Sequence, residues 1–160
     1  MKKSLLRVFL TVIVSLVSLT GFAQEQNKVE DGMKAIVEKY DSIEGFDCMT
    51  VVKGEGLELV KAAFNKQFGK KFMKGVTSMT IMTYTDASQE ACVALQKDLT
   101  TVLSLMKEFD TKGADTSKEF KSTKFYAIEE DEKVLSDCIF LFEGEDTKML
   151  LYMAGKINCN

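Results

Sequence analysis

The residues most capable of chemistry in this sequence are its four cysteines, Cys48, Cys92, Cys138 and Cys159. A thiol can act as a nucleophile, bind a metal or form a disulfide. None of the four belongs to a Cys-x-x-Cys pair, so their spacing does not predict a thioredoxin-like redox site. None directly follows an apolar leader either, so the sequence does not predict a lipid anchor.

Two interpretations of these cysteines remain open. The residues around Cys48, Cys92 and Cys138 are largely apolar, which favours three buried free thiols. An even number of cysteines in an oxidising compartment also permits disulfides. The expected strand directions favour a Cys92–Cys159 bridge that ties down the C-terminal tail, with Cys48 facing Cys138 if their strands are neighbours.

Several residue types that catalysis commonly uses are missing. The chain has no histidine, tryptophan or proline, and Arg7 is its only arginine. The absence of histidine excludes Ser-His-Asp and Cys-His catalysis and the commonest zinc ligand. The acidic runs at 129–132 and 143–146 lack the ligand spacing of a calcium loop and are typical of solvated hairpin turns. We therefore expect neither a cofactor nor a metal, and we expect a protein that is not an enzyme.

The segment from Met1 to Ala23 indicates the compartment. Lys2, Lys3 and Arg7 give it a positive start, an apolar run follows, and it ends in Gly21-Phe22-Ala23, a pattern typical of a cleavable secretory signal. A membrane span needs about 20 apolar residues, more than this run offers. We expect an exported protein, periplasmic or extracellular and not lipid-anchored, with residues 24–160 forming one domain.

Removal of the leader changes the charge balance. It takes away three cations and lowers the formal charge from −3 to about −6. An acidic exported domain is a poor candidate for binding nucleic acid or an anionic membrane surface.

Periodicity places the elements that must position these residues. Apolar residues at intervals of three and four predict helices over 29–43, from Gly56 to a stop at Gly69, and from a cap at Asp86 or Ser88 through Phe109. Runs rich in β-branched and aromatic residues predict strands over 46–52, 76–84, 121–129, 134–142 and 148–157. The order is helix-β-α-β-α-β-β-β. We therefore predict an α+β fold with a mixed sheet, in which a right-handed crossover joins two parallel strands and a C-terminal antiparallel meander follows.

One basic patch stands out in the acidic chain. Lys70, Lys71 and Lys74 surround Phe72 in the linker after the second predicted helix. A solvated linker explains this composition, and a docking point for an acidic partner is the alternative.

The sequence resembles a family of small exported proteins of Gram-negative gut-type bacteria that is described as a domain of unknown function. The resemblance is carried by the leader, by Lys74-Gly75-Val76 before the strand 79–84, and by the closing strand with Gly155-Lys156-Ile157. It implies an exported α+β domain without an established activity. Asp41-Ser42-Ile43 is similar to the short acceptor for periplasmic O-glycosylation in some of these bacteria, which makes Ser42 a candidate modification site.

The function most consistent with these features is a non-enzymatic binding or interaction domain in the periplasm or at the cell surface. Its partner would be an unidentified protein or a small apolar ligand. A thiol- or carboxylate-based enzyme or redox protein is the first alternative. A structural or assembly component of the cell envelope is the second.

Overall fold

The computed structural model of the chain describes residues 22–110 and 120–159. Most of the predicted leader, Met1 to Gly21, lies outside the described residues, and its cleavage point after Ala23 falls in the first turn of the first described helix. The elements follow in the order α2 (Phe22–Tyr40), β1 (Asp47–Val51), α3 (Glu55–Phe68), β2 (Gly75–Thr83), α4 (Gln89–Leu103), β3 (Lys107–Phe109), β4 (Phe120–Asp131), β5 (Val134–Gly144) and β6 (Lys148–Asn158). The α+β class, the predicted order and the C-terminal meander are confirmed, and the short strand β3 is an addition.

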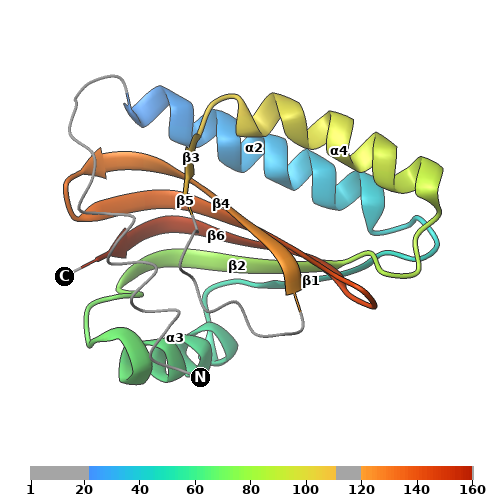
Figure 1. Cartoon of the computed structure of the whole chain (residues 1–160). Helices are drawn as coiled ribbons and strands as arrows, with labels where there is room; N and C mark the ends of the chain where they lie inside the picture. The colour runs from blue at the N-terminus through green and yellow to red at the C-terminus, as the bar shows by residue number, and fades with distance from the viewer. Residues whose placement is uncertain (1–21, 111–119, 160) are drawn as a thin grey trace.

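The strands form one six-stranded sheet in the order β1-β2-β6-β5-β4-β3. Every neighbouring pair is antiparallel, including β1 with β2, where Asp47 lies opposite Thr83 and Val51 opposite Met79. The mixed sheet with a parallel crossover was therefore wrong. Between β1 and β2 the chain makes an excursion through α3 and the turn at 69–74 and returns to the same end of the sheet, so β2 runs back along β1 (Figure 1).

The third helix ends earlier than the periodicity predicted. Ser88, one of the two predicted caps, accepts a hydrogen bond from the backbone N–H of Ala91 at 3.1 Å, and α4 runs from there only to Leu103. Phe109 belongs to β3 and is buried on the side of the sheet away from α4. The apolar stripe that predicted one helix through Phe109 therefore joins two elements that pack on opposite faces.

The sheet separates two layers of helix. Helices α2 and α4 lie side by side over one face, and α3 lies on the other (Figure 1). We call the first side the tyrosine face, because all four tyrosines of the chain, Tyr40, Tyr84, Tyr126 and Tyr152, are buried in its cluster. We call the second side the phenylalanine face, because its cluster includes Phe72, Phe109, Phe125 and Phe140, with Phe142 packed against it.

The two helices of the tyrosine face are held together closely. Val29, Met33, Ile36 and Tyr40 line the buried side of α2, and Cys92, Leu95, Leu99 and Val102 line that of α4. At Gly32 an added Cβ would lie 2.7 Å from a methyl carbon of Val102, so a larger residue would push the helices apart. Asp98 of α4 accepts hydrogen bonds from Lys39 at 2.6 Å and from the Tyr40 hydroxyl at 2.9 Å.

A bulge interrupts the pairing of β2 with β6 where the two motifs of the family resemblance meet. Gly75 lies opposite Lys156 and Val76 opposite Gly155 in the β2–β6 pair. Gly155 has a φ of +93°, and a Cβ there would collide with the carbonyl oxygen of Gly75. Only glycine adopts this conformation and permits this approach. The lysine-glycine step and the closing glycine are thus two sides of one close strand contact.

Candidate functional site

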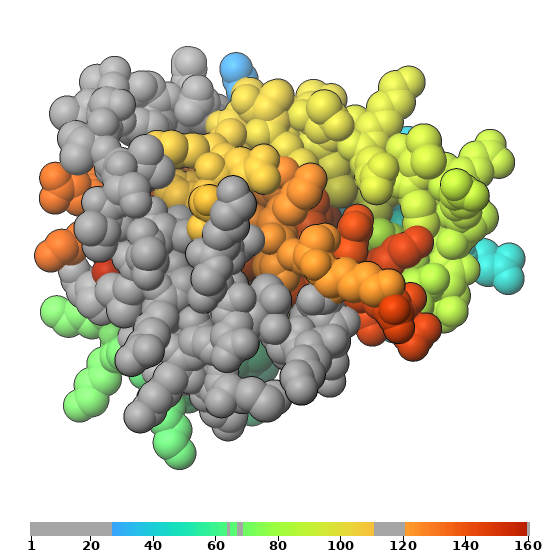
Figure 2. Space-filling view, in the orientation of Figure 1, coloured from blue at the N-terminus to red at the C-terminus, as the bar shows by residue number. Residues whose placement is uncertain are grey.

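A pocket of about 380 Å³ opens between α4 and the strands of the tyrosine face, within the size range of small-molecule sites. Four elements supply its walls: α4, the neighbouring halves of β4 and β5, and the end of β2 with Tyr84 directly after it. In Figure 2, α4 and side chains of β4 to β6 lie on the face toward the viewer. The lining residues are Tyr84, Leu95, Gln96, Leu99, Thr100, Leu103, Ser122, Lys124, Tyr126, Leu141 and Glu143.

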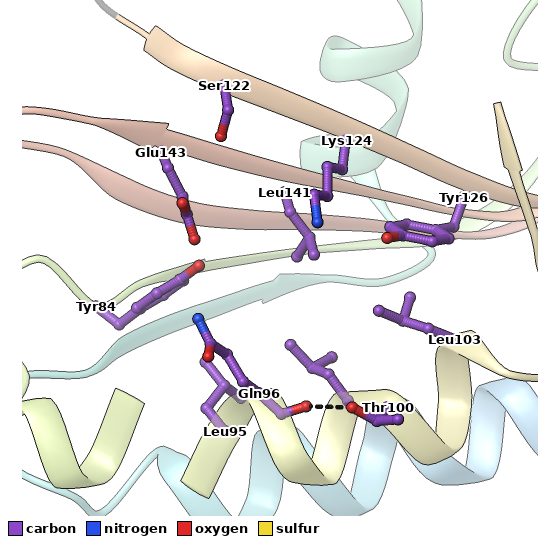
Figure 3. A pocket seen from close by; sticks show the side chains of 11 residues that line it. Tyr84, Leu95, Gln96, Thr100, Leu103, Ser122, Lys124, Tyr126, Leu141 and Glu143 are labelled. Carbon is purple, nitrogen blue, oxygen red and sulfur yellow. Dashed lines mark hydrogen bonds between the residues drawn. The ribbon is translucent and has the colours of Figure 1, made fainter. Parts of the chain in front are cut away.

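The pocket combines an apolar floor with polar walls. Leu95 and Leu99 are 0% and 2% exposed, and they form the floor with Leu103 and Leu141. Figure 3 shows Lys124 and Glu143 reaching from the strands toward α4, while the Gln96 amide reaches from α4 toward the strands. An apolar floor with a few convergent polar groups is the usual composition of a ligand site.

Strand register places the two charges of the pocket close together. Lys124 lies opposite Leu141 and Ser122 lies opposite Glu143, so Lys124 and Glu143 are diagonal neighbours on one face of the β4–β5 pair. Such neighbours are typically about 7–8 Å apart at Cα. Neither side chain has a hydrogen bond or an ion pair within the described part of the chain. The nearby Lys148 differs, because its Nζ lies 3.9 Å from the Cys92 Sγ.

Tyr84 forms one wall of the pocket. Burial, together with the negative charge of Glu143, raises the pKa of Tyr84 to about 12. Its hydroxyl therefore stays protonated at neutral pH and can donate a hydrogen bond into the pocket. The lining contains no cysteine, and its only carboxylate is Glu143.

All four cysteines are free thiols, and the predicted disulfide pairs are not formed. Cys92 belongs to the cluster of the tyrosine face and Cys159 to that of the phenylalanine face, so the sheet lies between them. Cys48 of β1 and Cys138 of β5 are separated by β2 and β6, which puts them three strand spacings apart. Both distances are too long for a bridge.

The environment of three of the cysteines makes their thiols poor nucleophiles. Burial, with the charges of Asp41 and Asp47, raises the pKa of Cys48 to about 11. Burial also raises the pKa of Cys159 to about 12 and that of Cys138 well above its usual value. Because the thiolate is the reactive form, these three thiols are inert at neutral pH.

The predicted lysine patch is only partly a surface. Lys70, Lys71 and Lys74 are exposed, whereas Phe72 is 5% exposed and belongs to the core of the phenylalanine face. The exposed patch therefore consists of three lysine charges, and the ring of Phe72 is not part of it. Ser42 lies exposed in the turn after α2, where a modifying enzyme could reach it, and its glycosylation stays a prediction.

Asp137 is a buried polar residue that sequence reasoning missed. It occupies the bulge in β5 with a φ of 50°, is 3% exposed and accepts a hydrogen bond from the Tyr152 hydroxyl at 2.8 Å. Burial raises its pKa to about 6, although the hydrogen bonds from Tyr152 and the backbone of Gly155 oppose this. Its position one residue before Cys138 in an apolar run was the available signal.

Residues 22–110 and 120–159 contain no group of three or more His, Cys, Asp or Glu side chains that could hold a metal ion. None of their helices is both long and apolar enough to cross a membrane. No family model, curated protein or solved structure matches this chain. The resemblance to a family of exported bacterial proteins therefore stays a prediction.

Proposed function

We propose that the protein is an exported, non-enzymatic binding domain that holds a small amphipathic ligand in the pocket between α4 and the sheet. The observation that carries this proposal is the pair Lys124 and Glu143, two opposite charges that reach over an apolar floor and form no ion pair or side-chain hydrogen bond within the described residues, although Lys148 lies opposite Glu143 on β6. Charged groups at the wall of a concave apolar site give orientation and specificity to a ligand.

Binding explains the composition better than catalysis does. The chain from Gln24 onward has neither histidine nor arginine, and three of its cysteines have raised pKa values. The buried carboxyl of Asp137 is not part of the pocket lining. The pocket lining contains no thiol and no histidine, and its Thr100 hydroxyl donates a hydrogen bond to the backbone carbonyl of Gln96 at 2.8 Å.

The charge pattern favours a zwitterion with an apolar body. A ligand carboxylate would pair with the Lys124 ammonium, and a ligand ammonium would pair with the Glu143 carboxylate. The apolar body would lie on Leu99, Leu103 and Leu141, with the Tyr84 hydroxyl as a further donor. A short hydrophobic peptide has both charges and fits the volume of about 380 Å³.

Calorimetric titration with leucyl-leucine tests the pocket. We expect Lys124→Met to weaken the binding of leucyl-leucine about fivefold, because exposed ion pairs contribute up to about 1 kcal/mol. The same variant should bind leucyl-leucine amide, which has no carboxylate, as well as the unchanged protein does. Glu143→Gln should show the reverse selectivity, weakening leucyl-leucine but not its N-acetyl derivative.

Lys121→Met is the matched control. Lys121 is on the same strand but pairs with Glu145 at 2.7 Å and does not line the pocket. Equal effects of Lys121→Met and Lys124→Met, or no binding of any of the three peptides, would contradict the pocket assignment.

Export is tested separately by expression of the complete sequence in a Gram-negative host. We expect the periplasmic fraction to hold a protein whose intact mass lacks Met1 to Ala23. An uncleaved protein confined to the cytoplasm would overturn this part of the proposal and leave the peptide titrations to be judged by themselves.

A further inference from the structure

The two edges of the sheet differ in how they are protected. The edge strand β3 has only three residues, and its Lys107 pairs with Glu129 of the neighbouring strand at 3.0 Å. The edge strand β1 has five residues, and among the described residues its backbone pairs only with β2. Short edges whose charges are used within the sheet resist pairing with other chains, whereas longer edges invite it.

The β1 edge also exposes apolar side chains. Met49 is 55% exposed and Val52, directly after the strand, is 61% exposed. They are two of the four large hydrophobic residues that are exposed in the described chain, and they lie within four positions of each other. Exposed apolar side chains beside unpaired backbone groups mark a surface for strand addition.

The sequence of this edge is complementary to itself. When two copies pair antiparallel with Thr50 opposite Thr50, Met49 of each copy lies opposite Val51 of the other. Asp47 at the start of β1 then lies level with Lys53 of the other copy, which is in the turn two residues after β1 ends. The pairing thus makes two attractive charge contacts and two apolar contacts related by a twofold axis. The neighbouring register, with Met49 opposite Met49, would place the charge of Asp47 opposite the apolar Val51.

We propose that the β1 edge pairs with the β1 edge of a second copy of this chain, so that two sheets join into one continuous sheet across a twofold axis. The partner is a second copy because the charges of Asp47 and Lys53 complement each other only in this self-pairing. The inference is independent of the ligand pocket, which lies across β2 and β6 from this edge.

Charge exchange tests the interface by sedimentation equilibrium on the exported chain. Lys53→Glu places like charges opposite each other twice, and we expect it to weaken dimerisation about tenfold. Exchange of both residues, Asp47→Lys with Lys53→Asp, should restore the dimer to within about threefold of the unchanged chain. Lys133→Glu, the same charge change in the β4–β5 turn, should leave the equilibrium unchanged.

Cysteine crosslinking tests the register. In a Cys48→Ser background, Thr50→Cys should form an intermolecular disulfide under mild air oxidation, because the two new thiols lie directly opposite each other. Met49→Cys should crosslink much more slowly, because its neighbour across the axis is Val51. A chain that stays monomeric at all concentrations, or one in which Met49→Cys crosslinks faster, would overturn the proposal. Thermal melts of each variant establish that it is folded before the comparison is made.

Discussion

The two faces of the sheet bury aromatic rings that make different contacts. On one face the rings stack on each other, and on the other face tyrosine hydroxyls form specific hydrogen bonds. On the phenylalanine face, the rings of Phe125 and Phe140 stack with centroids 4.5 Å apart, and Phe142 follows Phe140 at 5.9 Å. On the tyrosine face, Tyr40 bonds to Asp98 and Tyr152 bonds to Asp137. Ring stacking tolerates changes of shape, whereas a buried hydroxyl and its acceptor must keep their geometry.

The tyrosine face is also the side that contains the pocket. Tyr84 and Tyr126 stand at its walls, and the apolar floor continues directly into the core. Tyrosine supplies apolar area and one polar atom in the same side chain. A core built in this way can border a polar pocket without burying a polar atom that lacks a partner.

The largest expected effect concerns the phenylalanine face. Phe140→Ala removes the centre of the stack and should lower the free energy of unfolding by about 4 kcal/mol. Phe140→Leu keeps most of the volume and should cost less than about 1.5 kcal/mol. Denaturant titration measures both, and a similar loss for the two variants would show that ring geometry matters on this face as well.

The next effect is a pH dependence of stability that we expect from a buried carboxyl on the tyrosine face. The pKa of Asp137 is raised to about 6 in the folded protein, whereas an unfolded aspartate has a pKa of about 3.9. Between these values the folded state binds more protons than the unfolded state at Asp137. The contribution of Asp137 to the free energy of unfolding is therefore largest below about pH 4 and falls by up to about 3 kcal/mol as the pH rises through 6. Asp137→Asn should abolish this contribution, and asparagine tolerates the positive φ.

Denaturant midpoints at several pH values between about 4 and 7 check this. The matched comparison is Asp98→Asn. Hydrogen bonds from Lys39 and Tyr40 lower the pKa of Asp98, so this variant should not remove the loss of stability toward neutral pH. An unchanged slope in the Asp137→Asn variant would mean that another group titrates.

The smallest effects compare two hydroxyls of the tyrosine face. Tyr152→Phe leaves the buried Asp137 without its only side-chain donor among the described residues and should cost about 2 kcal/mol. Tyr84→Phe removes a hydroxyl that faces the pocket and should cost less than about 0.5 kcal/mol. Thermal unfolding of the pair gives the ranking, and equal losses would remove the distinction between a structural and a pocket tyrosine.

The sequence was sufficient to place most helices and strands, because apolar residues recur with a different period in a helix than in a strand. The spacing of Val29, Met33, Ile36 and Tyr40 predicts α2, and Gly69 ends α3 as expected. Strand direction was not predictable in the same way. The helix between β1 and β2 suggested a crossover, but a connection of this length also allows the chain to turn back, and no local pattern distinguishes the two paths.

The pocket could not be predicted, because its residues come from four separate segments. Leu99 belongs to the apolar stripe of the third predicted helix and Lys124 to the predicted strand 121–129, and no local pattern connects the two. Only the register of β4 with β5 brings Lys124 beside Glu143. The disulfide pairs failed for the same reason, since they depended on which strands are neighbours.

The position of β6 in the sheet has a consequence for the order in which the molecule forms. This strand is the last in the chain, yet it lies between β2 and β5, near the middle of the sheet. During synthesis, β2 has no partner on its inner side until Lys148–Asn158 has emerged. Contacts between distant parts of a chain form late and slowly. The sheet therefore cannot become continuous between β2 and β5 until its final strand is made.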